Sequence, residues 1–315
     1  MHMNSVSGKV AFITGGDSGL GLGIARAFLR AGMKVVITYR DENHLKHATR
    51  QLSAAGGTLH SIKLDVADRS AYRAAADDTI RVFGKVHVLV NNAGVWPTVP
   101  LSNASFHDFD WCMSVNVTGV FNGIRTLLSH IRSHGEGGHI VTTSSITGLA
   151  CGALWGLYST SKFAVVGMME ALRVELEDSE VGVSVFCPGG IISNIGRSDR
   201  NRPAELSDTG VPDAVQAARL QTYGKKVREI MLKSGGKPPM LDPMEAGELV
   251  LKGVLHNDLY IISHSEYESA IGERAEALLA SLPENREVGA ERAQIARVAS
   301  TTMYAREAAR RKRSE

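Results

Sequence analysis

Near its start the sequence reads Lys9-Val-Ala-Phe-Ile-Thr-Gly-Gly-Asp-Ser-Gly-Leu-Gly21, an apolar and β-branched run that stops at a cluster of glycines. Such a short apolar run is typical of a buried parallel strand. Beyond the glycines, apolar residues recur at helical spacing, at Leu22, Ile24, Ala25, Phe28 and Leu29. A strand, a glycine-rich turn and a helix together favour a dinucleotide site, because glycines admit a pyrophosphate that the helix N-terminus stabilises. A tight turn without a ligand is the alternative.

Apolar runs and helical patterns alternate along most of the remaining chain. Further strands are predicted at residues 34–39, 59–64, 86–90, 139–143, 181–186 and 260–263. Helices are predicted between them, at about residues 42–54, 70–83, 106–134, 155–176, 243–256 and 267–282. This alternation predicts an α/β fold, a doubly wound parallel sheet (Rossmann fold) in a three-layer αβα sandwich. With no internal repeat and no convincing linker, we expect one domain over residues 1–315.

Two segments depart from the alternation. Residues 193–242 are polar and rich in Arg, Lys, Asp, Gly and Pro, with a helix predicted over 214–233. So long an insertion in a compact domain is usually functional, and we interpret it as a substrate lid. Residues 283–315 are charged and are expected to form a C-terminal helical extension, ending in the short basic run 310–313.

The overall composition is that of an ordinary folded protein. Of 315 residues, 43% are hydrophobic and 22% charged, with a formal net charge of +2. This balance favours neither nucleic acid nor an anionic membrane as a partner. Three dispersed cysteines and the absence of an apolar segment at residues 1–8 lead us to expect a cytoplasmic location. We predict no metal site, and interpret His107, His130 and His134 as surface residues.

Tyr158 and Lys162 are four residues apart at the start of a predicted helix. Residues at this spacing share one helix face, so the lysine ammonium is expected close to the phenol. Lowering the tyrosine pKa from about 10 to about 7 requires roughly 4 kcal/mol of stabilisation of the phenolate. The pair would then donate and accept protons near neutral pH. The spacing alone is common by chance, and its meaning depends on the motifs around it.

In order along the chain, five motifs resemble those of the short-chain dehydrogenase/reductase family, in its single-domain branch. They are Thr14-Gly15-x3-Gly19-x-Gly21, Asn91-Asn-Ala-Gly94, Asn116, Ser145 with Tyr158-x3-Lys162, and Pro188-Gly189. The resemblance is strong over residues 8–192 and looser over 243–282. It implies oxidoreductase activity, with hydride transfer between a nicotinamide cofactor and a carbonyl or secondary alcohol carbon.

The resemblance also implies roles for four catalytic residues. Ser145, thirteen positions before Tyr158, would hydrogen-bond the substrate oxygen. Tyr158 would protonate the carbonyl oxygen or deprotonate the alcohol. Lys162 would lower the tyrosine pKa and hold the nicotinamide ribose, and Asn116 would kink its helix and seat a water that links Lys162 to solvent. Such a site makes chemical sense, because charge develops on an oxygen during hydride transfer.

The implied cofactor-binding residues lie in the loops that follow the strands. Those expected at the phosphates, the adenine, the ribose and the nicotinamide, together with the catalytic pair, are Gly15, Asp17, Ser18, Gly19, Leu20, Gly21, Tyr39, Arg40, Asp65, Val66, Asn91, Ala93, Gly94, Tyr158, Lys162, Pro188, Gly189, Ile191 and Ser193. Ser193 stands where the family usually has threonine, and it keeps the hydroxyl.

The end of the second predicted strand indicates NADP(H) as the cofactor. An acidic side chain there would accept the 2′-hydroxyl of NAD(H), but Tyr39 occupies that position and Arg40 follows. A guanidinium grips a phosphate with paired hydrogen bonds, for a preference of roughly ten- to a hundredfold. Asp17 and the pair Asp41-Glu42 oppose this, although residues 41 and 42 are expected to begin a helix and point away. NAD(H) is the alternative.

The expected substrate is an apolar small molecule, aromatic ones included. Trp96 and Trp155, with Leu149 and Leu154 nearby, are expected to border the reacting carbon. The alternative is that both tryptophans pack in the core. A non-catalytic nucleotide-binding regulator and an epimerase, dehydratase or enoyl reductase on the same fold are the alternative functions.

We also expect a homodimer or homotetramer. The predicted helices 106–134 and 155–176 carry more apolar residues than one sheet face can cover. These residues are Phe121, Ile124, Leu127, Leu128, Val165, Met168, Met169 and Leu172.

Overall fold

The computed structural model describes residue 3 and residues 5–152, 154–234, 240–283 and 289–311. Its centre is a seven-stranded parallel sheet with the strand order β3-β2-β1-β4-β5-β6-β7. The strands are β1 (Val10–Ile13), β2 (Lys34–Tyr39), β3 (Leu59–Lys63), β4 (Val88–Asn91), β5 (Gly138–Thr143), β6 (Val181–Cys187) and β7 (Tyr260–Ile262). The predicted doubly wound Rossmann fold is therefore confirmed. The strand order reverses between β1 and β4, where such sheets open a crevice for ligands.

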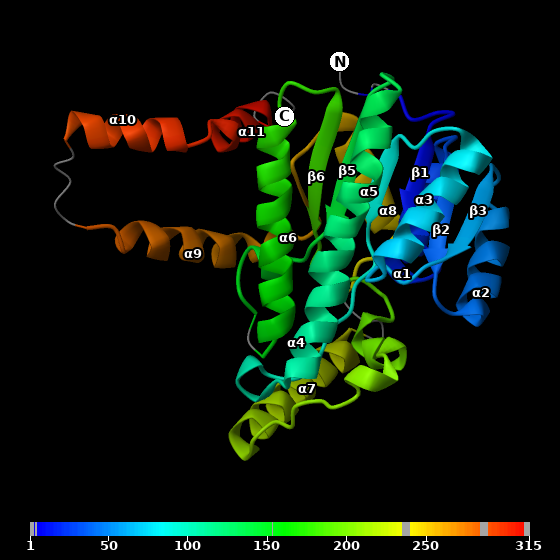
Figure 1. The fold of residues 1–315 in the computed structure, drawn as a ribbon. Coiled ribbons are helices and arrows are strands. Elements are labelled where there is room, and N and C mark those ends of the chain that lie inside the picture. The colour runs from blue at the N-terminus through cyan, green and yellow to red at the C-terminus, as the bar shows by residue number, and fades with distance from the viewer. Residues whose placement is uncertain (1–2, 4, 153, 235–239, 284–288, 312–315) are drawn as a thin grey trace.

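Helices cover both faces of the sheet and produce two hydrophobic layers. Helices α3 (Arg69–Phe83), α5 (Gly119–Ser133) and α6 (Gly156–Glu175) share one layer and lie in front of the sheet in Figure 1. The opposite layer contains α1 (Gly19–Arg30), α2 (Glu42–Ser53) and α8 (Pro243–His256). Side chains of β1 alternate between them, with Phe12 in the first layer and Ala11 and Ile13 in the second.

The helix predicted over residues 106–134 is present but not uniform. It consists of α4 (Phe106–Met113), a π-helical turn (Ser114–Thr118) and α5. Asn116 lies within the π turn, and its side chain bonds the backbone of Val95 outside the helix. A π turn accommodates such a local distortion of the hydrogen-bond ladder, and these turns are frequent at functional sites.

The polar insertion folds beyond the ends of α4 and α6, apart from the sheet (Figure 1). It contains short 3₁₀ helices at Ile195–Asn201 and Ala204–Leu206, followed by α7 (Ala214–Lys233). The helix predicted over 214–233 is confirmed. The buried carboxylate of Asp108 on α4 binds Arg202 at 2.8 Å and the Gly210 amide at 2.7 Å, which anchors the first half of the insertion.

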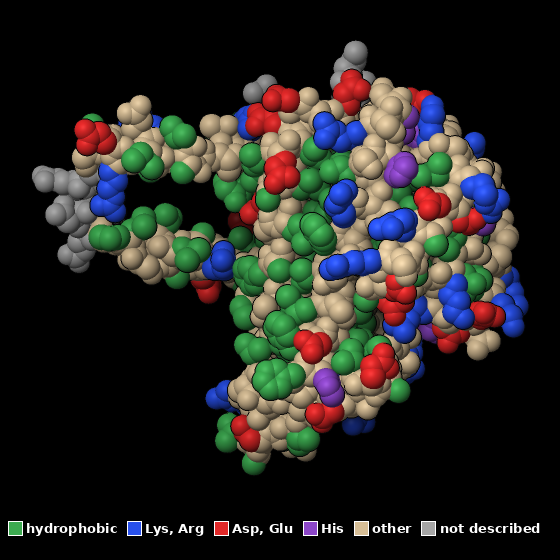
Figure 2. Space-filling view, in the orientation of Figure 1, with side chains coloured by type: hydrophobic (Ala, Val, Ile, Leu, Met, Phe, Trp, Pro, Cys, Tyr) green, Lys and Arg blue, Asp and Glu red, His purple; other side chains and the backbone are tan. Residues whose placement is uncertain are grey.

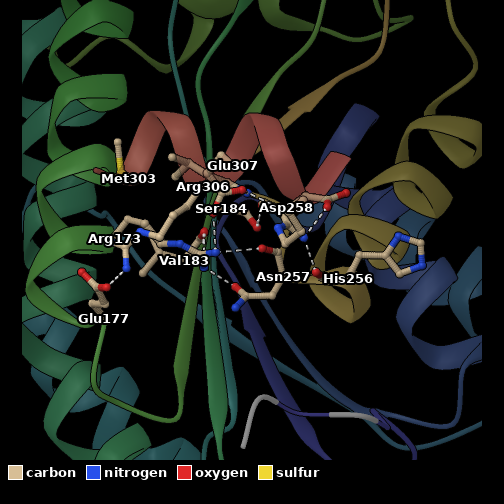
Figure 3. A network of polar contacts seen from close by, with 12 residues as sticks. Arg173, Glu177, Val183, Ser184, His256, Asn257, Asp258, Met303, Arg306 and Glu307 are labelled. Carbon is tan, nitrogen blue, oxygen red and sulfur yellow. Dashed lines mark hydrogen bonds and ion pairs between the residues drawn. The ribbon is translucent and has the colours of Figure 1, made fainter. Parts of the chain in front are cut away.

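The C-terminal helices first project away from the helices and strands of the αβα sandwich, and the last one packs against the sandwich again. Helices α9 (Glu268–Ala280) and α10 (Ala290–Ala299) project outward, and α11 (Met303–Arg311) lies beside α6 (Figure 1). Figure 3 shows the polar network that fixes α11: Glu307 pairs with Arg173 at 2.7 Å and with Arg310 at 2.6 Å. Met303 at the start of α11 is buried. The extension is thus anchored at its far end.

Candidate active site

The glycine-rich turn between β1 and α1 leaves no room for a side chain at Gly19 or Gly21. Gly19 has a φ of +49°, and a Cβ there would lie 2.8 Å from the Ser193 Cβ. A Cβ on Gly21 would lie only 2.1 Å from the Gly15 carbonyl oxygen. Ser18 precedes α1, and its hydroxyl makes no capping bond. The turn therefore presents an open backbone and the N-terminus of α1 to the adjoining cavity.

The ends of β1 and β4 are joined side by side at the strand reversal. The Thr14 hydroxyl accepts hydrogen bonds from the amides of Asn92 and Ala93, at 2.9 and 3.0 Å. Asn92 lines the cavity, whereas the Asn91 side chain is buried and donates to Thr142 Oγ1 at 3.3 Å. The Asn91 side chain therefore points away from the cavity, because successive side chains of a strand point to opposite faces, and a contact of Asn91 with the ribose stays a prediction.

Asn116 is buried and hydrogen-bonds the backbone of Val95, which lines the cavity. Its Oδ1 accepts from the Val95 amide at 2.8 Å, and its Nδ2 donates to the Val95 carbonyl at 2.9 Å and to Ser161 Oγ at 3.0 Å. The residue itself does not line the cavity. Asn116 therefore holds the loop that carries Trp96, and its role in seating a water stays a prediction.

The other three catalytic candidates converge. Ser145 follows β5, and its side chain hydrogen-bonds that of Tyr158 at the start of α6. The Lys162 ammonium lies 5.4 Å from the centre of the Tyr158 ring and donates to the Thr143 carbonyl at 2.9 Å. All three residues line the same cavity. Two hydroxyl groups and one ammonium group therefore lie near one another in the wall of this cavity.

The pKa of Tyr158 shifts in the direction opposite to the prediction. Burial raises it above its ordinary value of 10, and the hydrogen bond with Ser145 only partly opposes this. Burial also lowers the pKa of Lys162 to about 8. A phenolate loses its hydration in this site, and Lys162 directs its ammonium to Thr143. The predicted lowering of the tyrosine pKa by the lysine is therefore not found.

The cavity, of about 410 Å³, connects these groups with the glycine-rich turn. It contains nearly every predicted cofactor residue, namely Gly15, Asp17, Ser18, Gly19, Leu20, Gly21, Tyr39, Arg40, Asp65, Val66, Ala93, Gly94, Pro188, Gly189, Ile191 and Ser193. Asn91 is absent from this lining. Loops far apart in the sequence thus form one continuous surface.

Aromatic rings form the wall next to Tyr158. Trp96 lies 5.4 Å from Trp155 and 6.0 Å from Tyr158, and Trp155 lies 5.8 Å from Tyr223 of α7, measured between ring centres. Both tryptophans line the cavity, so the alternative that they pack in the core is wrong.

The two leucines predicted beside the tryptophans lie elsewhere. Leu149 packs against the core, and Leu154 lines a separate surface cavity. The turns before α6 direct them away from the main cavity, and Leu154 has a φ of +69°.

At the opposite end of the cavity, charged residues surround the end of β2. Arg40 Nη1 lies 3.4 Å from Asp65 Oδ2 and donates to the Asn201 carbonyl at 3.1 Å. Asp41 accepts from the amides of Asn43 and His44 and so caps α2. It also lines the cavity, contrary to the expectation that it points away, whereas Glu42 does not line it. Burial raises the pKa of Asp17, a further carboxyl group that lines the cavity.

Several lining residues have no counterpart among the sequence predictions. They come from the insertion and the segments that follow it: Asn194, Ile195, Ser198, Arg200, Asn201, Tyr223, Met240 and Tyr267. The insertion itself was recognisable from its polar composition. No motif or periodicity indicated which of its residues would face the cavity.

A metal-like cluster of His87, His134 and Glu136 lies outside this cavity. His87 Nδ1 accepts from the Val10 amide, and His134 Nδ1 accepts from the Glu136 amide. Their Nε2 atoms therefore carry the protons and face Glu136 Oε2 and the Val86 carbonyl, at 2.9 and 3.0 Å. With no ring lone pair left over, the cluster is a hydrogen-bond network.

Cys187 at the end of β6 is fully buried, and burial raises the pKa of its thiol to about 12, which suits packing rather than nucleophilic chemistry. Among the described residues, none of the helices combines the length and the apolarity needed to cross a bilayer.

Comparison with known proteins gives a consistent result. A family model described as short chain dehydrogenase matches residues 9–204. The C alpha-dehydrogenase of Sphingobium sp. strain SYK-6 is 37% identical over 282 residues, covering 89% of this chain and 88% of that protein. The 3beta-hydroxysteroid dehydrogenase 2 of Eggerthella lenta is 31% identical over 220 residues, covering 69% and 85%.

A solved structure agrees with these relatives. A short-chain dehydrogenase/reductase from Burkholderia phymatum in complex with NAD has a TM-score of 0.79 and 31% identity, covering 90% of this chain and 99% of its own. Fold, site and relatives lead to one conclusion: the chain belongs to the short-chain dehydrogenase/reductase family of oxidoreductases.

Proposed function

We propose that the protein is an NADP(H)-linked alcohol dehydrogenase or carbonyl reductase. The observation that carries this proposal is the convergence of Ser145, Tyr158 and Lys162 in a cavity that ends at the glycine-rich turn. The turn fits a dinucleotide, because Gly15, Ser18 and Gly19 line the cavity at the N-terminus of α1, where a pyrophosphate can be stabilised. When bound, the nicotinamide supplies or accepts the hydride.

The catalytic side chains would manage the proton and the charge on oxygen. The raised pKa of Tyr158 keeps its hydroxyl protonated at neutral pH, the form that donates a proton to a carbonyl oxygen during reduction. The Ser145 hydroxyl donates a hydrogen bond to the same oxygen as negative charge develops there. Lys162, whose ammonium donates to the Thr143 carbonyl, would hold the ribose hydroxyls of the cofactor with its remaining hydrogens.

The choice of NADP(H) rests on Arg40. Tyr39 offers no carboxylate to a 2′-hydroxyl, and Arg40 lines the cavity beside it. Related structures support a nicotinamide cofactor but not this choice, since the Burkholderia phymatum protein is in complex with NAD and one from Burkholderia cenocepacia, 26% identical, with NADP. Arg40 is already within 3.4 Å of Asp65, and a phosphate would have to compete for it.

The proposed substrate is an apolar ketone or secondary alcohol, aromatic ones included. Trp96, Trp155 and Tyr223 form an aromatic wall that would exclude water and favour flat or bulky apolar groups. Consistent with this, one relative is by name a 3beta-hydroxysteroid dehydrogenase. A non-catalytic regulator would not need the complete set of Ser145, Tyr158 and Lys162.

The proposed location is the cytoplasm. Cys112, Cys151 and Cys187 are all free thiols, as is usual in a reducing compartment.

A panel of carbonyls and alcohols, followed by absorbance of the reduced nicotinamide, tests this function. We expect kcat/KM for NADPH to exceed that for NADH by roughly ten- to a hundredfold, and Arg40→Ala to remove most of the difference. Arg50→Ala, an exposed arginine on α2 outside the cavity, is the matched control. Equal values for both cofactors in the wild type contradict the cofactor choice, and activity confined to small polar substrates contradicts the substrate class.

A further inference from the structure

The insertion reaches the cofactor end of the cavity as well as the substrate end. Ser193 packs against Gly19 in the glycine-rich turn, and the Asn201 carbonyl accepts from Arg40 at the end of β2. Between them, the 3₁₀ helix Ile195–Asn201 lines the cavity with Ser198 and Arg200. The insertion therefore covers the position proposed for the adenosine ribose.

Arg200 is a second cation that lines the cavity, and it has no ion-pair partner within 4.0 Å among the described residues. Arg40, by contrast, pairs with Asp65 at 3.4 Å. The Arg200 Nη1 atom donates to the carbonyls of Asn194 and Arg197, at 2.9 and 2.7 Å. Five guanidinium protons are available, so two acceptors leave donors for a further ligand.

The charge of Arg200 acts on the residues around the proposed phosphate position. Burial raises the pKa of Asp17, and the charges of His44 and Arg200 oppose that rise. Hydrogen bonds from the His44 and Asn43 amides lower the pKa of Asp41, and Arg200 adds to the lowering. Arg200 and Arg40 thus line the same cavity, and the Asn201 carbonyl, next in sequence to Arg200, accepts from Arg40 at 3.1 Å.

We propose that Arg200 is a second ligand, beside Arg40, of the 2′-phosphate of the cofactor, and that this contact fixes the insertion over the cavity. The inference rests on the proposed use of NADP(H). Two guanidinium groups from different segments would form charge-assisted hydrogen bonds with one phosphate. NAD(H), which has no such phosphate, would leave Arg200 without this ligand.

The insertion is coupled to the substrate end through the tryptophans. The Trp96 amide donates to Ser198 Oγ at 3.0 Å, the Arg202 guanidinium lies 4.2 Å from the Trp111 ring, and Trp155 contacts Tyr223. All three tryptophans of the chain therefore contact the insertion. Their fluorescence reports on its position without any need for catalysis.

Calorimetry with two probes tests the proposal: adenosine 2′,5′-bisphosphate, which carries the phosphate in question, and 5′-AMP, which lacks it. We expect the wild type to bind the bisphosphate more tightly, and Arg200→Ala to reduce the ratio of the two affinities by roughly tenfold or more. Arg197→Ala is the matched control, since Arg197 is exposed in the same 3₁₀ helix and does not line the cavity. Because Arg200 is exposed, thermal unfolding should be unchanged in both variants.

The outcomes separate this inference from the proposed function. A wild type with equal affinities for both probes overturns the choice of NADP(H) and the inference together. A preference that Arg40→Ala reduces and Arg200→Ala leaves intact overturns the inference alone. We also expect the bisphosphate, and not 5′-AMP, to change the tryptophan emission, and to do so less in Arg200→Ala. An emission that responds equally to both probes contradicts the coupling.

Discussion

Lys162, a proposed catalytic residue, is buried at a cost to folding. Its side chain is 3% exposed, and its pKa of about 8 lies below the ordinary value of 10.5. Between these two pH values the unfolded chain holds the proton and the folded chain does not, so stability rises with pH there. Below pH 8 the buried ammonium costs about 3 kcal/mol of folding free energy.

Lys162→Met should therefore abolish function and stabilise the protein. We expect a gain of about 2 kcal/mol at pH 7, because the lost hydrogen bond to Thr143 offsets about 1 kcal/mol. The gain should shrink as the pH rises from 8 to 10.5. Denaturant unfolding at several pH values measures it, with Lys252→Met, at an exposed lysine of α8, as the control. A loss of stability that is the same at every pH contradicts this account.

At the residue scale, the sequence motifs predicted which side chains lie together in the site, but they did not predict how burial changes the pKa values of these side chains. The spacing of Ser145, Tyr158 and Lys162 placed these residues together because each lies in or next to a regular element. The Tyr158 pKa could not be predicted, since it depends on burial by loops remote in the sequence. The motif also did not indicate that the side chain of Asn92, and not that of Asn91, would line the cavity.

At the scale of elements, a buried ion pair anchors the first half of the insertion. Asp108 on α4 is fully buried and Arg202 is 8% exposed, with 2.8 Å between them. Burial alone would raise the pKa of Asp108, but hydrogen bonds from Gly210, Ser105 and Arg202 outweigh it and lower that pKa. The carboxylate thus stabilises the fold above its ordinary pKa of 3.8, and this contribution is lost as the pH falls through the lowered value.

Removing one partner should free the insertion. Arg202→Met leaves the Asp108 carboxylate buried without its cation, which we expect to cost about 3–5 kcal/mol and to open residues 193–213 to proteases. Asp199→Asn is the control, because Asp199 also pairs with Arg202 but is 58% exposed and should change stability by less than about 1 kcal/mol. Limited proteolysis at neutral pH that cuts the wild type and Arg202→Met at equal rates counts against the anchor.

The elements of the insertion could be predicted only in part. Helix α7 follows the pattern of residues 214–233, because helical periodicity is a local property. Its position depends on contacts such as Trp155–Tyr223 and Arg202–Asp108, which join segments far apart in the sequence. Such contacts between distant segments cannot be predicted from the local pattern of a single sequence.

At the scale of the whole molecule, most of the apolar residues predicted to exceed one sheet face are buried within the subunit, whereas Phe121, one of the same set, is exposed. Ile124, Leu127, Val165, Met169 and Leu172 were expected to exceed what one sheet face covers, yet all five are buried within the subunit. Phe109, Phe121 and Val174 remain 44%, 50% and 38% exposed. Figure 2 shows hydrophobic side chains over α6 and on the projecting helices α9 and α10.

A homodimer or homotetramer stays our prediction, since exposed apolar patches of this kind often mark protein interfaces. Light scattering at micromolar concentration should give two or four times the mass of one chain. Phe121→Glu on α5 should shift the protein toward the single-chain mass, and Val82→Glu on α3, 40% exposed, should not. A single-chain mass for the wild type contradicts the prediction.

We expect Tyr158 to transfer the proton while the dinucleotide binds elsewhere in the cavity. The most direct measurement compares turnover and NADPH affinity in wild type and Tyr158→Phe, which removes only the hydroxyl that bonds Ser145. We predict a turnover lower by about 10²–10⁴-fold, the usual contribution of a general acid, with a cofactor dissociation constant within about twofold of the wild type. A variant that keeps most of the wild-type turnover would contradict the account.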